Sequence, residues 1–178
     1  PTEVSQGILL VCRAPSASLA EFDRVGNPRL LLLDGLQDPG NVGTLIRSAW
    51  AFGLDGVVAL DGTADPWSPK AVRAAAGGVF RTVVLTLSWE EVGGWLAAAG
   101  VPILASGAQG RPAERVEPGP RWALVVGSEA RGVRPDILAL ARHTLAVPMP
   151  GGADSLNAAM AGTVLLHDLT RARSIAAG

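Results

Sequence analysis

Apolar residues along this chain gather in short continuous runs, and the stretches between the runs place them at helical spacing. Such runs predict strands buried on both faces of a sheet, here at residues 29–34, 56–60, 81–87, 101–105, 122–126 and 144–147. The stretches between them predict helices at residues 41–52, 68–77, 88–99 and 134–141. Strand and helix thus alternate from residue 29 onward. This alternation predicts an α/β domain with a mostly parallel sheet flanked by helices.

The ends of the chain and one internal stretch depart from this alternation. An apolar run at residues 7–13 predicts a leading strand, and the small residues that follow it predict a loop. Residues 106–120 are rich in glycine, proline and charge, so we expect a long loop there. The last helix is expected over residues 154–173, with Asp154 and Ser155 at its N-cap because both side chains accept backbone hydrogen bonds.

Length and composition limit the classes of protein that this chain can belong to. Its 178 residues, 48% of them hydrophobic, suffice for one sizeable core but not for two ordinary domains. The formal net charge is −1, so any RNA contact must come from a local patch or from another part of the protein. Cys12 is the single cysteine, which excludes a disulfide within the chain and fits a cytosolic protein. No apolar run reaches the length of a membrane span, and no His/Cys cluster has zinc-ligand spacing.

Three predicted strands lead into segments rich in glycine and polar residues, at residues 34–47, 127–133 and 147–157. Ligands of doubly wound sheets bind beyond the carboxyl ends of the strands, so these segments predict one shared site. A glycine-rich turn that leads into a helix also offers backbone N–H groups to a polar ligand. The familiar nucleotide fingerprints are missing, because no G-x-G-x-x-G follows the first strand and no Lys-Ser or Lys-Thr follows the glycine at 132. A dinucleotide- or NTP-dependent enzyme is therefore disfavoured.

The ordered combination of these segments closely resembles the SpoU family of RNA 2′-O-ribose methyltransferases, within the SPOUT superfamily, over residues 29–173. The three segments resemble the family's first, second and third motifs, and the matching residues are Asn41, Arg47, Gly127, Glu129, Ser155, Leu156 and Asn157. Ala158 and Ala159 depart from the family pattern, which commonly has larger residues there. Many members carry an amino-terminal RNA-binding domain. Residues 1–28 are interpreted as a leading strand and linker where such a domain would join, and residues 29–178 as the methyltransferase domain.

The resemblance implies an enzyme that takes S-adenosylmethionine as methyl donor and methylates a ribose 2′-hydroxyl of rRNA or tRNA in the cytoplasm, without a metal. It also implies a homodimer and a C-terminal trefoil knot, a SPOUT-type topology that composition and periodicity could not indicate. The family's catalytic residues correspond here to Arg47, Asn41, Glu129, Ser155 and Asn157. The residues implied for cofactor binding are Ala105, Ser106, Gly107, Val126, Gly127, Ser128, Val147, Met149 and Leu156. Those implied for RNA binding are Lys70, Arg73 and Arg131. Leu145 and Val147 would add apolar walls, although plain core packing also explains them.

Several of these residues have more than one possible role. Methyl transfer from a sulfonium to a hydroxyl mainly requires positioning and proton removal. Arg47 is expected near the hydroxyl, either as the base or, because a guanidinium rarely gives up its proton, as a phosphate-binding group while Glu129 or water takes the proton. Asn41 could cap its helix, contact the ribose or position Arg47, and Glu129 could instead pair with Arg131 or Arg134. The competing functional hypothesis is a non-catalytic RNA- or nucleotide-binding module on the same scaffold.

Overall fold

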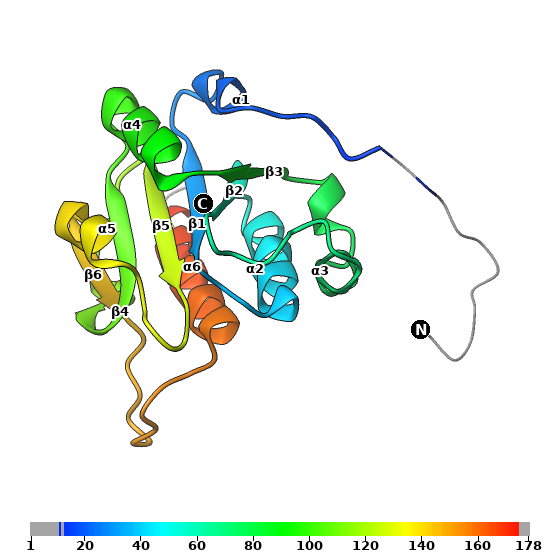
Figure 1. Cartoon of the computed structure of the whole chain (residues 1–178). Coiled ribbons are helices and arrows are strands. Elements are labelled where there is room, and N and C mark those ends of the chain that lie inside the picture. The colour runs from blue at the N-terminus through cyan, green and yellow to red at the C-terminus, as the bar shows by residue number, and fades with distance from the viewer. Residues whose placement is uncertain (1–10, 12, 175–178) are drawn as a thin grey trace, which may run out of the picture.

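The computed structural model describes residue 11 and residues 13–174. Its centre is a six-stranded sheet in the order β3-β2-β1-β5-β4-β6, and every neighbouring pair of strands is parallel (Figure 1). The strands are β1 (Arg29–Asp34), β2 (Gly56–Leu60), β3 (Val83–Leu87), β4 (Ile103–Pro112), β5 (Trp122–Gly127) and β6 (His143–Ala146). The predicted α/β class with a mostly parallel sheet is confirmed. The trefoil knot implied by the resemblance stays a prediction.

Helices cover both faces of the sheet, which makes three layers (Figure 1). The helices that pack on one face are α2 (Pro39–Ala51), α3 (Pro69–Ala74) and α6 (Ala158–Ser174). Those on the other face are α1 (Ala20–Asp23), α4 (Trp89–Ala99) and α5 (Pro135–Leu140). Two short 3-10 helices complete the elements, η1 (Gly78–Phe80) and η2 (Ala113–Arg115). No helix in the described part of the chain is both long and apolar enough to span a membrane.

The continuous apolar runs form strands because both faces of the sheet are covered. Successive side chains of β1 point to opposite faces, so Leu31 and Leu33 join the core beneath α2 and α6 while Leu30 and Leu32 join the core beneath α4. All four leucines are fully buried. Burial of apolar surface stabilises the fold, so a strand covered on both faces is favoured over any conformation that leaves two of these leucines in water.

Two of the predicted helix starts are confirmed by their capping bonds. The Ser68 hydroxyl accepts a hydrogen bond from the backbone N–H of Ala71, and Pro69 occupies the first turn of α3, where its missing N–H costs nothing. At the start of α4, the Ser88 hydroxyl accepts from the Glu91 N–H and the Glu91 carboxylate accepts from the Ser88 N–H. This reciprocal capping box lowers the pKa of Glu91, since the ionised carboxylate is the better acceptor for the Ser88 hydroxyl and backbone N–H.

The two helices that carry the family motifs start elsewhere than predicted. Helix α2 begins at Pro39, and Asp38 is its N-cap, with a side chain that accepts a hydrogen bond from the Gly40 N–H. The proposed capping role of Asn41 is therefore wrong, because Asn41 lies inside the first turn. Helix α6 begins at Ala158 rather than at residue 154, and the segment from residue 147 to residue 157 contains no helix.

The cap of α6 is Asn157, so the prediction of Asp154 and Ser155 as caps is wrong. The Asn157 side-chain oxygen accepts hydrogen bonds from the backbone N–H groups of Ala159 at 2.9 Å and Met160 at 3.3 Å. All three candidates are good capping residues, so local preference does not choose among them. Asn157 is selected as the cap because it is the residue whose side chain contacts Asn41 of α2.

Strand β4 is longer than predicted, because residues 106–112 continue it where a loop was expected. The extension pairs with β6, and the register of this pairing shifts between Ser106 and Arg111. The shift accommodates the extra, glycine-rich residues of β4 while the strand stays in the sheet. Most of the predicted leading strand at residues 7–13, including Cys12, lies outside the described residues. The short helix α1 that follows was not predicted.

Candidate active site

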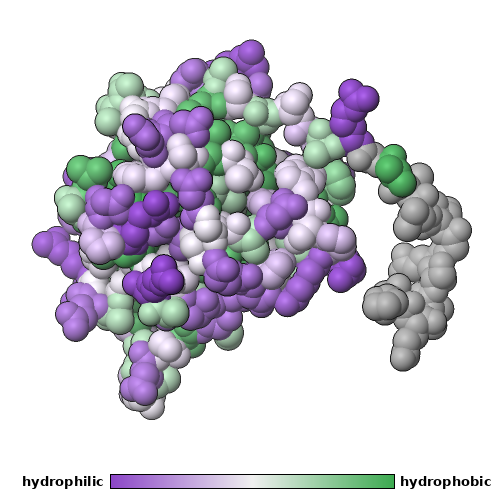
Figure 2. Space-filling model, viewed as in Figure 1, coloured by the Kyte–Doolittle hydropathy of each residue, from purple (hydrophilic) through white to green (hydrophobic). Residues whose placement is uncertain are grey.

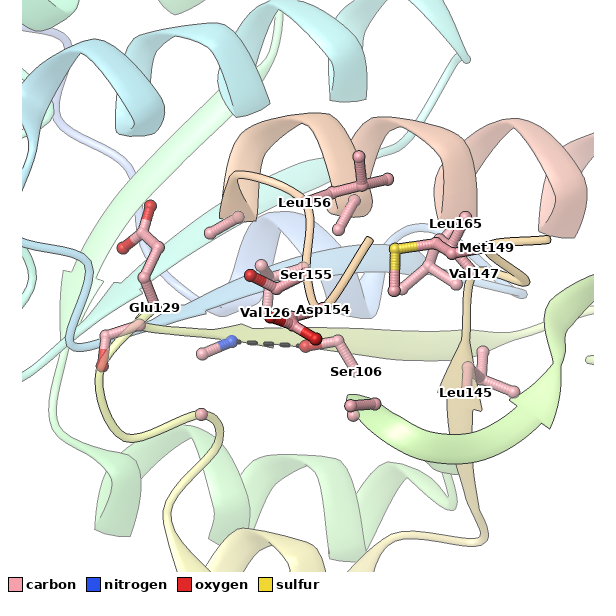
Figure 3. Close-up of a pocket in the computed structure, with 17 residues that line it drawn as sticks. Ser106, Val126, Glu129, Leu145, Val147, Met149, Asp154, Ser155, Leu156 and Leu165 are labelled. Atoms are coloured by element: carbon pink, nitrogen blue, oxygen red, sulfur yellow. Dashed lines mark hydrogen bonds between the residues drawn. The ribbon is translucent and has the colours of Figure 1, made fainter. Parts of the chain in front are cut away.

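The carboxyl ends of β5 and β6, the middle of β4, and α6 with the loop that precedes it surround a pocket of about 220 Å³ (Figure 3). The lining residues are Ser106, Gly107, Ala108, Val126, Gly127, Ser128, Glu129, Gly132, Leu145, Val147, Met149, Asp154, Ser155, Leu156, Ala158, Ala161 and Leu165. Every residue implied for cofactor binding lies in this lining except Ala105. Ala105 is fully buried in the sheet, where it pairs with Val125 and Thr144.

The pocket has apolar walls and an uneven distribution of polar groups. Val147, Met149 and Leu145 stand at one end, and Glu129 stands at the other (Figure 3). Leu145 is fully buried and also lines the pocket, so it serves both as core and as wall. Beneath them the Gly127 N–H donates to the Ser106 hydroxyl at a long 3.4 Å. Pockets with apolar walls and a few placed polar groups are typical of small-molecule sites.

The charged residues of the lining are all acidic. Glu129 and Asp154 contribute carboxylates, and the lining contains no Lys, Arg or His. A pocket of this composition favours a ligand with an apolar body and positive charge over one with phosphates, because carboxylates attract the first and repel the second. Within the described residues, no group of three His, Cys, Asp or Glu side chains gathers as a metal site.

Gly127 is required by a close approach of the chain to itself. The loop after β5 folds back through a hydrogen bond from the Gly132 N–H to the Ser128 carbonyl at 2.8 Å. A Cβ on Gly127 would lie 2.1 Å from the Gly132 carbonyl carbon and 2.2 Å from the Val133 nitrogen, too close for any side chain. The glycine therefore lets the loop that carries Glu129 close over the end of the strand.

Three predicted catalytic residues form a chain of hydrogen bonds at the rim of the pocket. The Asn157 amide nitrogen donates to the Asn41 side-chain oxygen at 3.1 Å, and the Asn41 amide nitrogen donates to the Glu129 carboxylate at 2.6 Å. The capping bonds set its direction. Because the Asn157 oxygen is occupied by helix N–H groups, its nitrogen must face Asn41, which in turn must present its own nitrogen to Glu129. The third motif thereby fixes which side-chain atom of Asn41 faces the Glu129 carboxylate.

Close packing of α6 against α2 brings Asn157 to Asn41. A Cβ on Gly162 would lie 2.7 Å from the Leu45 side chain, so the glycine lets the two helices approach. The hydroxyls of Ser48 and Thr163 lie 2.7 Å apart across the same contact. This packing joins the first and third motifs, whose Asn41 and Asn157 are 116 residues apart in the sequence.

Arg134 pairs with Asp34 rather than with Glu129. The Asp34 carboxylate, almost fully buried at the end of β1, accepts hydrogen bonds from the Arg134 backbone N–H at 2.8 Å and from its Nε at 2.9 Å. This pair ties the far end of the Glu129 loop to the sheet. The pair of Asp34 with Arg134 was not predicted from the sequence, although an acidic residue that closes an apolar run is an available signal. The helical spacing of Ala158, Ala161 and Leu165 could likewise have revealed the wall that α6 provides.

The remaining predicted residues lie outside the pocket or at its edge. Ser155 lines the pocket and is exposed. Arg47 is exposed on α2, six residues after Asn41 and therefore about 9 Å further along the helix axis. It lines a separate groove between α2 and α6 with Met160 and Val164. The structure thus joins Asn41, Glu129 and Asn157 but does not place Arg47 in the same pocket.

The three residues predicted to bind RNA are all at least partly exposed. Lys70 donates a 2.6 Å hydrogen bond to the Asp38 carboxylate, and this bond, with the backbone N–H of Gly40, lowers the pKa of Asp38. Arg73 lies on α3, and Arg131 lies in the loop after β5. The basic residues therefore flank α2 and the pocket from two sides.

Comparisons with known proteins agree with the motifs. The model of the SpoU rRNA Methylase family matches residues 28–167. The chain is 40% identical to the 23S rRNA (guanosine(2553)-2′-O)-methyltransferase RlmP of Bacillus subtilis (strain 168), over 94% of the chain and 66% of that protein. It is 34% identical to the 23S rRNA (uridine(2479)-2′-O)-methyltransferase of Streptomyces viridochromogenes, over 80% of the chain and 52% of that protein. The chain thus spans less than two thirds of the length of these relatives.

A solved structure with the same fold is the SpoU methyltransferase AviRb from Streptomyces viridochromogenes in complex with the cofactor AdoMet. It superposes with a TM-score of 0.82 at 31% identity, over 90% of this chain and 63% of that one. An AdoMet-bound rRNA methyltransferase from Sinorhizobium meliloti gives a TM-score of 0.77 at 33% identity, over 82% of this chain and 56% of that one. The resemblance inferred from the motifs is confirmed, and this chain belongs to the SpoU rRNA methylase family.

Proposed function

We propose that this chain is the catalytic domain of an S-adenosylmethionine-dependent methyltransferase that methylates a ribose 2′-hydroxyl of rRNA. The observation that carries the proposal is the hydrogen-bond chain from Asn157 through Asn41 to Glu129 at the rim of an acidic, apolar-walled pocket. The printed names of the relatives support an enzyme over a non-catalytic binding module, and support rRNA over tRNA. A cytoplasmic location accords with such a substrate.

The lining of the pocket fits S-adenosylmethionine. Val147, Met149 and Leu156 offer apolar surface to an adenosine, and the carboxylates of Glu129 and Asp154 complement a cation. When bound, S-adenosylmethionine supplies a methyl group activated by a sulfonium. The absence of basic residues from the lining disfavours the phosphates of NAD and ATP.

Glu129 and Arg47 divide the remaining work in this proposal. The carboxylate of Glu129, held by the Asn41 amide, accepts the proton of the ribose hydroxyl directly or through a water. Arg47 binds the phosphate beside the target ribose so that the hydroxyl faces the pocket, because a guanidinium suits phosphate recognition better than proton removal. Asn41 and Asn157 hold the carboxylate in position.

Calorimetry with S-adenosylmethionine, NAD and ATP tests the cofactor assignment. We expect heat of binding with S-adenosylmethionine alone. A silent titration with that compound, or tighter binding of ATP, would contradict the proposal.

Substitution of Arg47 by Ala tests its role. We expect loss of methyl transfer to rRNA with little change in S-adenosylmethionine affinity, because Arg47 does not line the pocket. Arg142→Ala is the matched control, since Arg142 is also exposed but lies just before β6, at the opposite edge of the sheet. Normal turnover of Arg47→Ala would remove Arg47 from the mechanism.

We also propose that the chain forms a homodimer through the groove between α2 and α6. Met160 and Val164 expose 59% and 37% of their surfaces beside this groove, and both lie on one stripe of α6. In a two-fold symmetric dimer the same patch of both subunits is in contact, so this stripe would be buried against its copy in the partner. Met160→Glu should give a monomer in light scattering, and an unchanged mass would exclude this face.

A further inference from the structure

An aromatic pair stands on the surface beside α2, away from the pocket. Phe80, at the end of η1, is 62% exposed, and its ring centroid lies 6.1 Å from that of Trp67 at an interplanar angle of 56°. Trp67 is half-buried against the core, and its backbone N–H is held by the Asp65 carboxylate at 2.9 Å. One ring is thus anchored and the other is presented to solvent.

The pair borders a groove of about 350 Å³ that also includes Arg81. Exposed aromatic surface next to an open groove is not required by the fold, because the core beneath it is already closed by Val79 and Leu54. The side chain of Phe80 could be polar without opening that core. A ligand is therefore a better explanation for its exposure than packing.

The segment that carries the pair is basic, and Arg73 and Arg81 are its two arginines. Residues 66–89 contain Lys70, Arg73 and Arg81 and no acidic residue, in a chain whose net charge is −1. Asp55, which also lines the groove, and Asp65, two residues before Trp67, are bonded to backbone N–H groups, and Lys70 is paired with Asp38. Arg73 and Arg81 therefore supply the cationic groups of this surface. In Figure 2, hydrophilic residues gather at the lower right of the globular part, where Figure 1 places α3. A partner for this surface should carry negative charge and flat rings.

The surface also lies next to Arg47. Gly78, in the same 3-10 helix as Phe80, packs so closely on α2 that a Cβ there would lie 3.3 Å from the Arg47 Cα. At the other end of α3, Lys70 reaches the N-cap of α2, one turn from Asn41. The basic and aromatic residues therefore run alongside α2 from the rim of the pocket to Arg47.

We propose that Trp67 and Phe80 form a stacking platform for an unpaired RNA base near the target nucleotide, with Arg73 and Arg81 on the adjoining phosphates. Single-stranded RNA is recognised through bases stacked on aromatic side chains, and arginines beside the rings bind the backbone. This inference rests on the proposed function, because it names how the same site receives its RNA.

Phe80→Ala tests the platform without disturbing the anchored Trp67. Loss of one stacked base should weaken binding of a short single-stranded RNA about 5- to 150-fold, while a duplex of equal length loses little. Phe80→Trp should restore binding, since any large ring can stack. Arg81→Ala should weaken both RNAs and reduce the salt dependence of binding.

Leu140→Ala is the matched control, because Leu140 is 64% exposed on α5, away from the groove. Thermal unfolding and S-adenosylmethionine affinity should be unchanged in all of these variants. Wild-type affinity of Phe80→Ala for single-stranded RNA would overturn the platform, and so would an altered oligomeric state, which would assign the surface to a protein contact. RNA binding is measured apart from methyl transfer, so failure of the platform and failure of the proposed function are distinguishable.

Discussion

Asn157 performs two tasks with the two ends of one amide, and substitution can separate them. Its oxygen caps α6 by accepting two backbone N–H groups, and its nitrogen donates to Asn41. Removal of an N-cap side chain costs about 0.5–2 kcal/mol. The exposed bond to Asn41 adds up to about 1 kcal/mol. For a domain of this size, Asn157→Ala should lower the melting temperature by about 1–12 °C.

Asn157→Asp keeps the cap and removes the donor. A carboxylate is as good a cap as an amide and suits the positive end of the helix dipole, so the melting temperature should stay at the wild-type value or rise slightly. With no donor left at this position, the Asn41 amide must turn its nitrogen toward the new carboxylate, and Glu129 then loses its hydrogen bond. Loss of a bond to a charged group costs about 1.5–3 kcal/mol, so methyl transfer should fall about 12- to 150-fold.

Differential scanning calorimetry and a methyl-transfer assay on rRNA measure the two effects on the same preparations. Ser155→Ala is the control, because Ser155 was the expected cap but makes no capping bond and should change stability by less than about 0.5 kcal/mol. Equal destabilisation by Ser155→Ala and Asn157→Ala would refute the assignment of the cap to Asn157. An Asn157→Asp variant that melts like Asn157→Ala, or that retains full activity, would refute the two separate roles of the Asn157 amide.

Three further predictions concern the pocket and α2. Gly127→Ala should destabilise by about 1–3 kcal/mol in thermal unfolding and weaken cofactor binding in calorimetry, because its Cβ would meet the Gly132 backbone at 2.1 Å. Asp154→Asn should weaken S-adenosylmethionine about two- to fivefold and S-adenosylhomocysteine less, since only the first carries a sulfonium; equal losses in calorimetry would exclude an interaction of Asp154 with the sulfonium. The hydrogen bond from Lys70 lowers the pKa of Asp38, so its stabilisation is present at neutral pH and is lost as pH falls through that lowered pKa. Lys70→Met should therefore melt below wild type at pH 7 and match it in acid, and a difference that persists in acid would contradict this.

Most of the secondary structure could be predicted because its causes are local. Leu30 to Leu33 form a run that only a doubly covered strand can bury, and Ser88 and Glu91 carry a capping box in their spacing alone. The motif residues could also be identified from the sequence, because the family motifs are defined by residue types in a fixed order along the chain. Asn41, Glu129 and Asn157 were therefore expected in one site, although their contacts could not be read from their order.

Tertiary structure decided what depends on residues distant in sequence. Asp154, Ser155 and Asn157 are all good caps, and only the approach of α6 to α2, permitted by Gly162, selects Asn157. The apolar runs of the strands resemble one another, so the sequence does not say which strands are neighbours. The tertiary structure decided the strand order and the pairing of the β4 extension with β6. Hydrophobic periodicity states which residues must be buried but not against which partner, because burial is non-directional. The sequence by itself therefore determined most of the elements, the class and the family, while the fold alone decided which amide meets which carboxylate.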